Sequence, residues 1–384
     1  MIRTLRRRVT LPVLLALIVL VAAGCVSTRL GVSWPSISMI DDQYILLAYN
    51  SYLVLIEPAT GEEVKLRDSD GNVRIDPETG EARTWELDGA SNQQAFYSTP
   101  LRLDDNTLLA AEYNGRFVKI DYAAARINNP AGNPISGHVV ADVTVGGDRL
   151  YVGYNSQNLE AFDLESLSVL WAFETTSGIW SKPLLHNGVL YITSMDHNLY
   201  AIDSADGSEL WRVDLQGAAA GAPVIANDRL YVGTFARTVV EVNLEGEITA
   251  TFTANNWVWG SPVIEGDIAY VTDLSGYVYA LSVPGLEQVW SVQAAESGIR
   301  PSVLLAGDFV VTASRDGRVT WLDKGDGSVA IARELQTEVL SEMLYIPAGP
   351  NVSQDIIVVA TVQADRPLVA FGARDGQLLW EYRR

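Results

Sequence analysis

Cysteine and histidine are nearly missing from this sequence: its 384 residues include one cysteine and three histidines. A single cysteine cannot form an intramolecular disulfide, so the folded chain must be held together by its apolar core. The histidines, His138, His186 and His197, stand apart without the H-x-H or H-x-x-x-H spacing that suits a transition metal. We therefore predict no metal site.

Basic residues are also scarce. The 27 lysines and arginines are outnumbered by 47 acidic residues, and the net charge is −20 at neutral pH. Such a chain lacks the charge that binds phosphates, so we expect no nucleic acid among its partners. Serine nucleophile elbows, phosphate-cradling glycine loops and paired acids at glycosidase spacing are missing too. The sequence therefore predicts a protein that is not an enzyme.

Only one long apolar run occurs, from Leu11 to Ala23, and it follows four arginines. A basic segment, a short apolar core and small residues before Cys25 are typical of an export signal. We predict a signal peptide over 1–24, lipidation at Cys25 as in a bacterial lipobox, and a lipidated tether over 25–33. Two alternatives stay open: a cleaved signal peptide followed by an unrelated cysteine, or an uncleaved anchor helix.

The rest of the chain repeats itself. The tyrosines Tyr151, Tyr191, Tyr231 and Tyr270 recur at a step of about 40 residues, and the unit 181–211 contains the turn and strand signals of four short strands. Four antiparallel strands per repeat predict one blade of a β-propeller. When two insertions of about 30 residues together are set aside from residues 34–384, eight blades leave about 40 residues each and seven leave about 46. We therefore predict an all-β, eight-bladed propeller as one closed, monomeric domain.

A tryptophan ends four of the units, ten residues after an alanine. It can lie between neighbouring blades, bury its ring and donate its N–H to a loop carbonyl. These predicted blade-docking residues are Trp171, Trp211, Trp290 and Trp380. The pattern fails at Lys65, Asn129, Thr251 and Ile331, so we expect about half of the blades to dock differently.

The repeat, Ala-x-Asp, then Gly, then Trp, resembles that of PQQ-like (quinoprotein-type) propellers. Among these, the length, the lipobox and the lack of catalytic residues resemble the BamB lipoproteins of outer-membrane β-barrel assembly. The resemblance implies a non-catalytic envelope scaffold whose partner is an envelope protein, such as an Omp85-type barrel. A cofactor is not expected, because the adjacent disulfide-bonded cysteines of many PQQ enzymes are impossible here and no calcium ligands can be assigned.

Unusual residues gather where the topology places the blade linkers and the hairpins between second and third strands, on one face. They are Trp180, Lys182, Trp257, Trp259, Arg300 and Arg315. Aromatic residues and arginine are enriched at protein interfaces, so we predict a partner-binding or ligand-binding face. Three interpretations stay open: this face binds a protein, it binds a small molecule or glycan through the central funnel, or the tryptophans only plug the channel.

Three further expectations concern the ends of the chain and one insertion. The excursion 67–84 could be an extra hairpin, and its acidic start is an acidic turn rather than a calcium loop. The ring must close by side-chain packing between the last and first blades, or by residues 26–33 adding a strand. If the host has two membranes, we expect the protein at the periplasmic face of the outer membrane; otherwise at the outer face of the cytoplasmic membrane.

Overall fold

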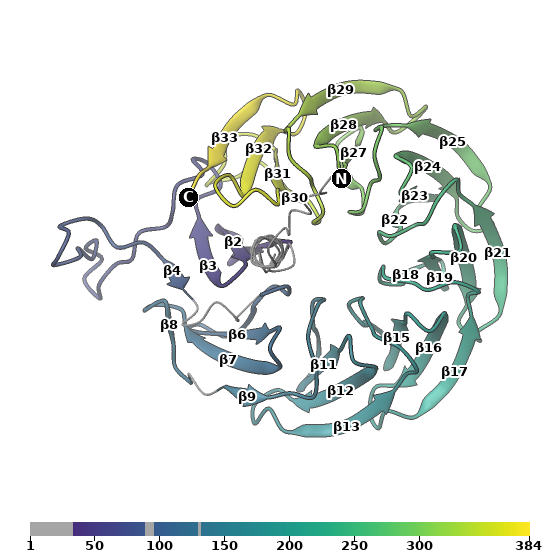
Figure 1. Cartoon of the computed structure of the whole chain (residues 1–384), viewed down its shortest axis with the longest axis horizontal. Coiled ribbons are helices and arrows are strands. Elements are labelled where there is room, and N and C mark those ends of the chain that lie inside the picture. The colour runs from purple at the N-terminus through teal and green to yellow at the C-terminus, as the bar shows by residue number, and fades with distance from the viewer. Residues whose placement is uncertain (1–33, 89–95, 130–131) are drawn as a thin grey trace, which may run out of the picture. The chain divides into compact units, whose positions relative to one another are not determined.

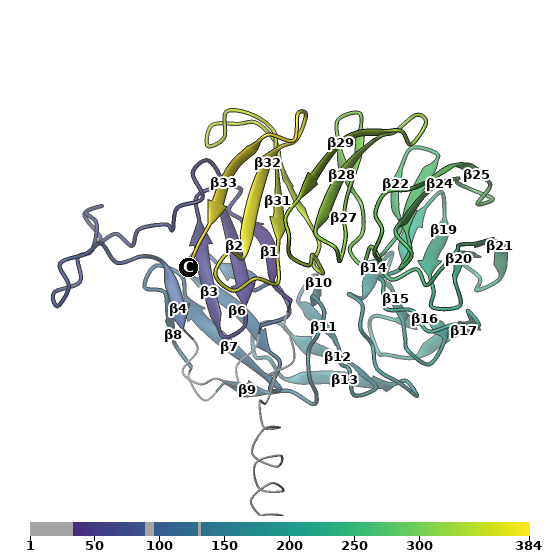
Figure 2. The ribbon, with the colours of Figure 1, turned by 45° about the horizontal axis from the view of Figure 1, so that its top comes forward.

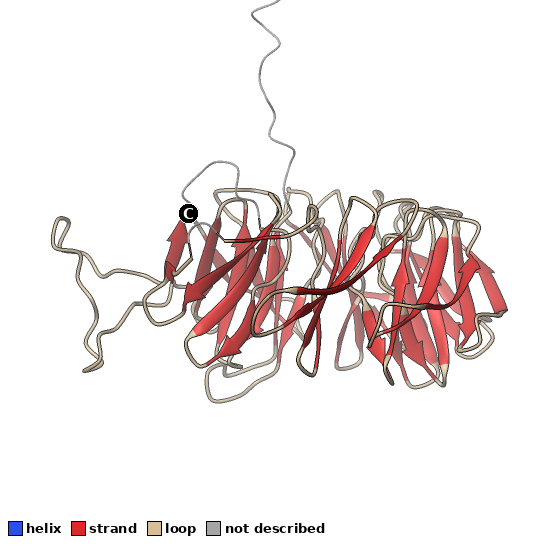
Figure 3. Cartoon of the chain, turned by 90° about the horizontal axis from the view of Figure 1, so that it is seen from below, coloured by secondary structure: helices blue, strands red, loops and turns tan. Residues whose placement is uncertain are grey.

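The fold is a ring of eight four-stranded antiparallel sheets (Figure 1). The computed structural model describes residues 34–88, 96–129 and 132–384, and these ranges contain strands and loops but no helix (Figure 3). Nothing in this described part therefore forms a helix long and apolar enough to cross a membrane. The predicted signal peptide, the tether and Cys25 lie outside the described residues. The predicted all-β, eight-bladed architecture is confirmed.

Each blade runs from an inner strand at the channel to an outer strand at the rim. Blades one to four are formed by β1 (Ser36–Ile40), β2 (Tyr44–Tyr49), β3 (Tyr52–Ile56), β4 (Glu86–Asp88); β5 (Leu101–Asp104), β6 (Thr107–Glu112), β7 (Arg116–Asp121), β8 (Arg126–Ile127), β9 (Asn133–Pro134); β10 (Thr144–Gly146), β11 (Arg149–Gly153), β12 (Asn158–Asp163), β13 (Val169–Glu174); β14 (Leu184–His186), β15 (Val189–Thr193), β16 (Asn198–Asp203), β17 (Glu209–Asp214).

Blades five to eight repeat the same order of strands. They are formed by β18 (Val224–Ala226), β19 (Arg229–Gly233), β20 (Thr238–Asn243), β21 (Ile248–Thr253); β22 (Val263–Glu265), β23 (Ile268–Thr272), β24 (Tyr277–Ser282), β25 (Gln288–Gln293); β26 (Leu304–Ala306), β27 (Phe309–Ala313), β28 (Arg318–Asp323), β29 (Val329–Glu334); β30 (Leu344–Ile346), β31 (Ile356–Ala360), β32 (Leu368–Gly372), β33 (Leu378–Tyr382). The outer strand of blade two is broken in two, since β8 and β9 both pair with β7.

Turn chemistry fixes the strands of each blade. In blade four, Asn187 and Gly188 both have positive φ, 50° and 80°, the backbone that a two-residue hairpin turn requires. Asp203, at the end of β16, accepts a hydrogen bond from the N–H of Ala205 and so stabilises the next turn. Asp163 and Asp323 make the equivalent bonds to Ser166 and Gly325, which confirms that these aspartates stabilise turns.

The four predicted docking tryptophans all lie between blades. Each indole packs flat on a turn glycine of the next blade, and its Nε1–H donates to a carbonyl of the same turn. The acceptors are Ser204 for Trp171 (3.3 Å), Leu244 for Trp211 (2.8 Å), Lys324 for Trp290 (2.9 Å) and Pro58 for Trp380 (2.8 Å). Each of the four indoles therefore contacts the neighbouring blade through both its ring and its N–H group.

Two of the four blades in which the spacing fails still use a tryptophan. Blade one uses Trp85, which follows the insertion and donates to the carbonyl of Tyr122, so the insertion hides it from the spacing. In blade seven the tryptophan stands on the third strand instead of the fourth. Trp321 occupies the position that is alanine in other blades, and it pairs with Ile331, which occupies the usual position of the tryptophan. The fully buried Trp321 donates to the carbonyl of Ala373 in blade eight, 3.0 Å away.

Two blade interfaces of the described chain contain no docking tryptophan. Between blades two and three, apolar residues including Phe117 and Phe162 form the contact. Between blades five and six, the buried carboxylate of Glu241 accepts a hydrogen bond from the N–H of Gly285, at 2.7 Å. The register pairs Glu241 with Ala250, so the missing tryptophan belongs at Ala250, not at Thr251 as the spacing predicts. The turn before β21 is one residue shorter than in blade four.

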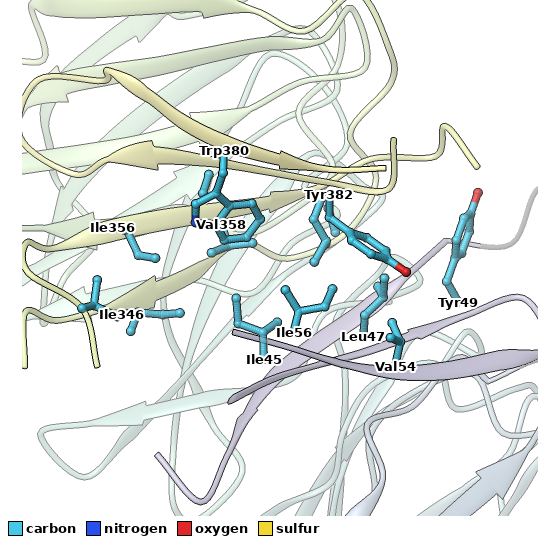
Figure 4. Packing of buried hydrophobic residues seen from close by; sticks show 14 of the residues in the cluster. Ile45, Leu47, Tyr49, Val54, Ile56, Ile346, Ile356, Val358, Trp380 and Tyr382 are labelled. Atoms are coloured by element: carbon cyan, nitrogen blue, oxygen red, sulfur yellow. The ribbon is translucent and has the colours of Figure 1, made fainter. Parts of the chain in front are cut away.

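Side chains close the ring. Blade eight takes all its strands from the C-terminal part of the chain, and blade one takes all of its own from residues 36–88. Trp380 and Tyr382 of β33 point toward Ile45, Leu47 and other apolar residues of blade one (Figure 4). The hydroxyl of Tyr382 also donates to Glu63, at 2.7 Å. Of the two predicted modes of closure, packing between the last and first blades accounts for the described contacts.

The insertion leaves the ring as a folded arm between β3 and β4 (Figures 1 and 2). Isolated antiparallel bridges, such as Lys65 with Thr84 and Ile75 with Ala82, hold it together, so it is hairpin-like although it forms no full strand. At its tip, Asp68 accepts hydrogen bonds from the N–H groups of Asp70 and Asn72. These bonds hold the pKa of Asp68 below its usual value. The acidic start of the arm is therefore a hydrogen-bonded turn.

Candidate functional site

The blade linkers and the hairpins between second and third strands bind each other by backbone hydrogen bonds. Hairpin N–H groups donate to carbonyls of the preceding linker: Met195 to Gly178, Leu274 to Trp257, and Arg315 to Gly298. The distances are 2.9, 2.9 and 3.0 Å. This ladder places the linkers and these hairpins on one face of the ring, as the topology predicts. We call it the linker face.

Hairpin aspartates fix the linkers further. Asp273 is fully buried and accepts from the N–H of Asn256 (3.0 Å) and the hydroxyl of Tyr279 (2.8 Å). Asp196 likewise accepts from Thr176 and Tyr200. These bonds hold the pKa of Asp196 below its usual value despite the opposing effect of burial. The aspartates have a positioning role that sequence reasoning did not assign.

Every linker also inserts one apolar side chain into the core. Ile179, Val258 and Ile299 are fully buried. Gly153 and Gly233 make room for two of them, since an added Cβ would lie 2.6 Å from Ile179 and 2.3 Å from Val258. The residue directly after this buried side chain, such as Trp180 after Ile179, points toward the central channel. Successive side chains of an extended chain point to opposite sides, so the residue two positions later, such as Lys182, also points toward the channel.

Two stacked tiers of side chains result. The upper tier, nearer the linker face, consists of Trp34, Tyr97, Val140, Trp180, Ala220, Trp259, Arg300 and Leu340. The lower tier consists of Ser36, Thr99, Asp142, Lys182, Ala222, Ser261, Ser302 and Glu342. All of these except Ser302 line a cavity of about 270 Å³ at the centre of the ring. The upper tier is mostly aromatic and apolar, whereas the lower tier is mostly polar.

Arg300 dominates the upper tier. Its guanidinium lies over the ring of Trp259, 4.1 Å from the centroid, and over that of Trp34 at 4.4 Å. Such cation–π contacts favour a cation with little hydration, which suits arginine. Burial, and then repulsion from Arg315, lower the pKa of Arg300 to about 10. Two aromatic rings thus contact its charge, and no described carboxylate forms an ion pair with it.

The aromatic contacts continue on both sides of Arg300. On one side Trp259 contacts Trp180, with centroids 6.3 Å apart, and Phe235 at 4.9 Å. Phe235 stacks on Trp257, which is 46% exposed at the outer surface of the linker face. On the other side a chain of ring contacts leads from Trp34 through Tyr97 and Tyr113 to His138. Aromatic rings therefore extend from the channel mouth across the linker face.

Trp257 and Arg315 line a second depression beside the channel, together with Asn256, Leu274 and Glu296. Arg315 forms an ion pair with Glu338, at 3.6 Å, and both side chains are largely exposed. Exposed pairs of this kind contribute little to stability. Trp257 and Arg315 are therefore available to contact another molecule.

The lower tier holds two carboxylates and one ammonium group. Glu342 accepts hydrogen bonds of 3.0 Å from the N–H and the hydroxyl of Ser302, while Asp142 accepts one of 2.7 Å from the N–H of Thr99. Enclosure by the ring raises the pKa of Glu342, and the nearby charge of Asp142 raises it further. Lys182, in the blade next to that of Asp142, forms no ion pair with any described residue.

The structure thus places all six predicted site residues on or under the linker face, but in two groups. Trp180, Lys182, Trp259 and Arg300 line the central cavity, and Trp257 and Arg315 lie outside it. Sequence reasoning missed Trp34, Asp142 and Glu342. Alignment of the repeats could have found the two acids. Ala-Asp-Val at 141–143 and Ser-Glu-Met at 341–343 align with Ser-Lys-Pro of blade four, so Asp142 and Glu342 occupy the position of Lys182.

The residues of the cavity do not fit the PQQ and calcium pair of quinoprotein enzymes. Calcium requires several oxygen ligands at one point. No group of three or more histidine, cysteine, aspartate or glutamate side chains that could hold a metal ion exists in the described ranges 34–88, 96–129 and 132–384. We assign no step of chemistry to these side chains.

Eight four-stranded blades with tryptophans docked on turn glycines define a β-propeller of the quinoprotein repeat type. The family model described as outer membrane protein assembly factor BamB matches residues 30–173, 126–220, 168–282, 195–329 and 274–384. Because these matches cover most of the sequence, the chain belongs to this family. No curated protein matches the sequence.

Two solved structures illustrate the fold. The computationally designed protein Ika8 superposes with a TM-score of 0.65 at 13% sequence identity, over 91% of this chain and 96% of the designed chain. BamB from Moraxella catarrhalis superposes with a TM-score of 0.64 at 14% identity, over 87% of this chain and 92% of that one. Identities this low carry information about the fold alone.

Proposed function

We propose that this protein is a non-catalytic scaffold of the bacterial cell envelope that binds a partner protein through its linker face. Its role would be in outer-membrane protein assembly, as the name of its family suggests. The partner would be an envelope protein of the Omp85 barrel type. The observation that carries the proposal is the band of aromatic and arginine side chains that ends at the exposed Trp257 and Arg315.

Physical chemistry supports this assignment of the face. Tryptophan and arginine contribute most to binding when a partner covers them, because they combine large apolar area with a directional polar group. Here the stacked rings of Trp257 and Phe235 are already ordered, so little side-chain entropy is lost on binding. The body of the protein is acidic, whereas this depression presents a guanidinium.

We further propose that Cys25 carries the lipid that attaches the protein to the membrane, at the periplasmic face of the outer membrane in a host with two membranes. Cys25 precedes Trp34 by nine residues, and nine extended residues span at most about 30 Å. Because Trp34 lies at the mouth of the channel, this tether would keep the linker face near the membrane. A partner embedded there would lie within reach. Labelling with radioactive palmitate should mark the parent chain and spare Cys25→Ser.

The interaction is tested by purifying the tagged, full-length protein from its own cells in detergent and quantifying the proteins that accompany it. Trp257→Ala combined with Arg315→Ala should reduce recovery of an Omp85-type barrel by about 30-fold, the effect of losing about 2 kcal/mol at an interface. The matched control is Leu210→Ala with Val289→Ala, two exposed apolar side chains of outer strands. Equal recovery with both double variants, or no barrel at all, would overturn the proposal.

A further inference from the structure

The charges that line the central cavity are separated around the ring. Asp142 belongs to the inner segment of blade three and Glu342 to that of blade eight, so the acids bound the arc formed by blades eight, one, two and three. Lys182 in blade four and Arg300 in blade seven bound the other arc. One half of the cavity wall is therefore negative and the other half positive.

These charges do not neutralise each other. No ion pair joins Lys182 or Arg300 to any carboxylate of the described residues. The pKa of Arg300 is lowered by burial and by another cation, and that of Glu342 is raised by burial and by another carboxylate. Arg300 therefore has a second cation nearby, and Glu342 has a second carboxylate nearby. An opposite charge brought into the cavity would stabilise both groups.

The space between the two arcs suits a small organic molecule. The cavity has a volume of about 270 Å³, and its upper tier offers the ring faces of Trp180 and Trp259 on the positive side. Both acids keep lone pairs after accepting their hydrogen bonds from Ser302 and Thr99. Lys182 has three donors available. Opposite charges in the wall of one cavity, beneath aromatic rings, complement a molecule that carries both charges and an apolar group.

We propose that the central cavity is a binding site for a zwitterionic ligand of the amino-acid class. The ligand's carboxylate faces Lys182 and Arg300, its ammonium group faces Asp142 and Glu342, and its side chain packs against Trp180 and Trp259. This site is separate from the proposed partner contact at Trp257 and Arg315, so either proposal can fail without the other.

The experiment is isothermal titration calorimetry of the chain from residue 26 onward, the complete propeller, with three probes of the same size. L-Phenylalanine carries both charges, phenylacetate only the negative one and phenethylamine only the positive one. We expect L-phenylalanine to bind at least tenfold more tightly than either of the others, because each charge-assisted contact contributes about tenfold or more. Equal affinity for the three probes, or no binding of L-phenylalanine, would overturn the proposal.

Titration of variants with the same probes then tests which arc binds the carboxylate of the ligand and which binds its ammonium group. Lys182→Met should weaken L-phenylalanine and phenylacetate by about tenfold and leave phenethylamine unchanged. Glu342→Gln should weaken L-phenylalanine and phenethylamine instead. Trp257→Ala, outside the cavity, should bind all three probes like the parent protein. Loss of all probes with Lys182→Met, or the same pattern in both cavity variants, contradicts the proposed orientation.

Discussion

The rim and the channel of this propeller are built from the same repeats but differ in how strictly they repeat. At the rim, equivalent positions carry the same residue with the same contact: Trp171, Trp211, Trp290 and Trp380 each pack on a glycine and donate to a turn carbonyl. At the channel, equivalent positions carry different residues, such as Trp180, Ala220 and Arg300. Packing requires the same shape at each interface, whereas a site needs different chemistry at each position.

The strongest test of the rim removes the tryptophan that closes the ring. Trp380→Ala should lower the free energy of unfolding by about 3–5 kcal/mol, because a large buried ring and its hydrogen bond are lost. No peptide linker of the described chain joins blade eight to blade one, so we also expect a smaller denaturant m-value than for Trp211→Ala. Guanidinium unfolding followed by circular dichroism measures both quantities.

The control for that measurement is Trp257→Ala. This side chain belongs to the linker face and is largely exposed, so the change should stay within about 0.5 kcal/mol. Equal losses for Trp257→Ala and Trp380→Ala would show that the difference between the rim and the linker face has no energetic basis.

Blade seven tests whether the rim tolerates exchange of its two positions. Trp321→Ala should cost about 3–5 kcal/mol, since this indole is fully buried. Adding Ile331→Trp rebuilds the arrangement of the other blades and should recover at least about 1 kcal/mol, whereas Ile331→Trp alone should cost about 1–3 kcal/mol by overpacking. A double-mutant cycle from denaturant unfolding gives the coupling energy. Simple additivity of the two changes would contradict the exchange.

The glycines beneath the tryptophans give a smaller effect. Gly207→Ala should cost about 2–3 kcal/mol, because φ is +78° and the new Cβ would lie 2.5 Å from the Trp171 ring. Gly188→Ala has a similar φ of +80° but nothing within 4 Å, so only the backbone strain of about 1 kcal/mol remains. Thermal unfolding of the two variants separates packing from strain. Identical melting temperatures would mean that the indole moves aside.

The smallest expected effect concerns the channel and depends on pH. The pKa of Glu342 is raised in the folded state, so the folded protein binds this proton more tightly than the unfolded chain does. Stability therefore falls as the pH rises from the ordinary carboxyl value through the raised one. Glu342→Gln should remove this loss and raise Tm by about 1–2 °C above that range. A variant whose melting temperature follows the parent's at every pH from 4 to 8 would contradict this.

Much of the rim could be predicted from the sequence, and its exceptions show where prediction stopped. Trp171 and Trp211 were found because a local spacing repeats with the fold. Trp85 was missed because the inserted arm separates it from its alanine partner position, and Trp321 because it stands on the neighbouring strand. The missing tryptophan of blade five was assigned one residue too far along, since a turn is shorter there.

The linker face could be predicted in part. Trp180, Trp257 and Arg300 stood out because they break the repeat, but the separation into a cavity group and a surface group needed three-dimensional structure. Glu342 and Asp142 have the same side-chain chemistry as the many surface acids of this chain. Only their positions in the inner segments of blades eight and three distinguish them.

By itself, the sequence determined the class of fold, the number of blades and the residues that dock four of them. These features depend on periodicity and on local turn chemistry, both of which are written along the chain. The tertiary structure decided how the ring closes, which tryptophan serves each interface and which charges share the channel. Those contacts join residues far apart in the chain, such as Trp380 and Pro58, and they arise only when eight blades meet around one axis.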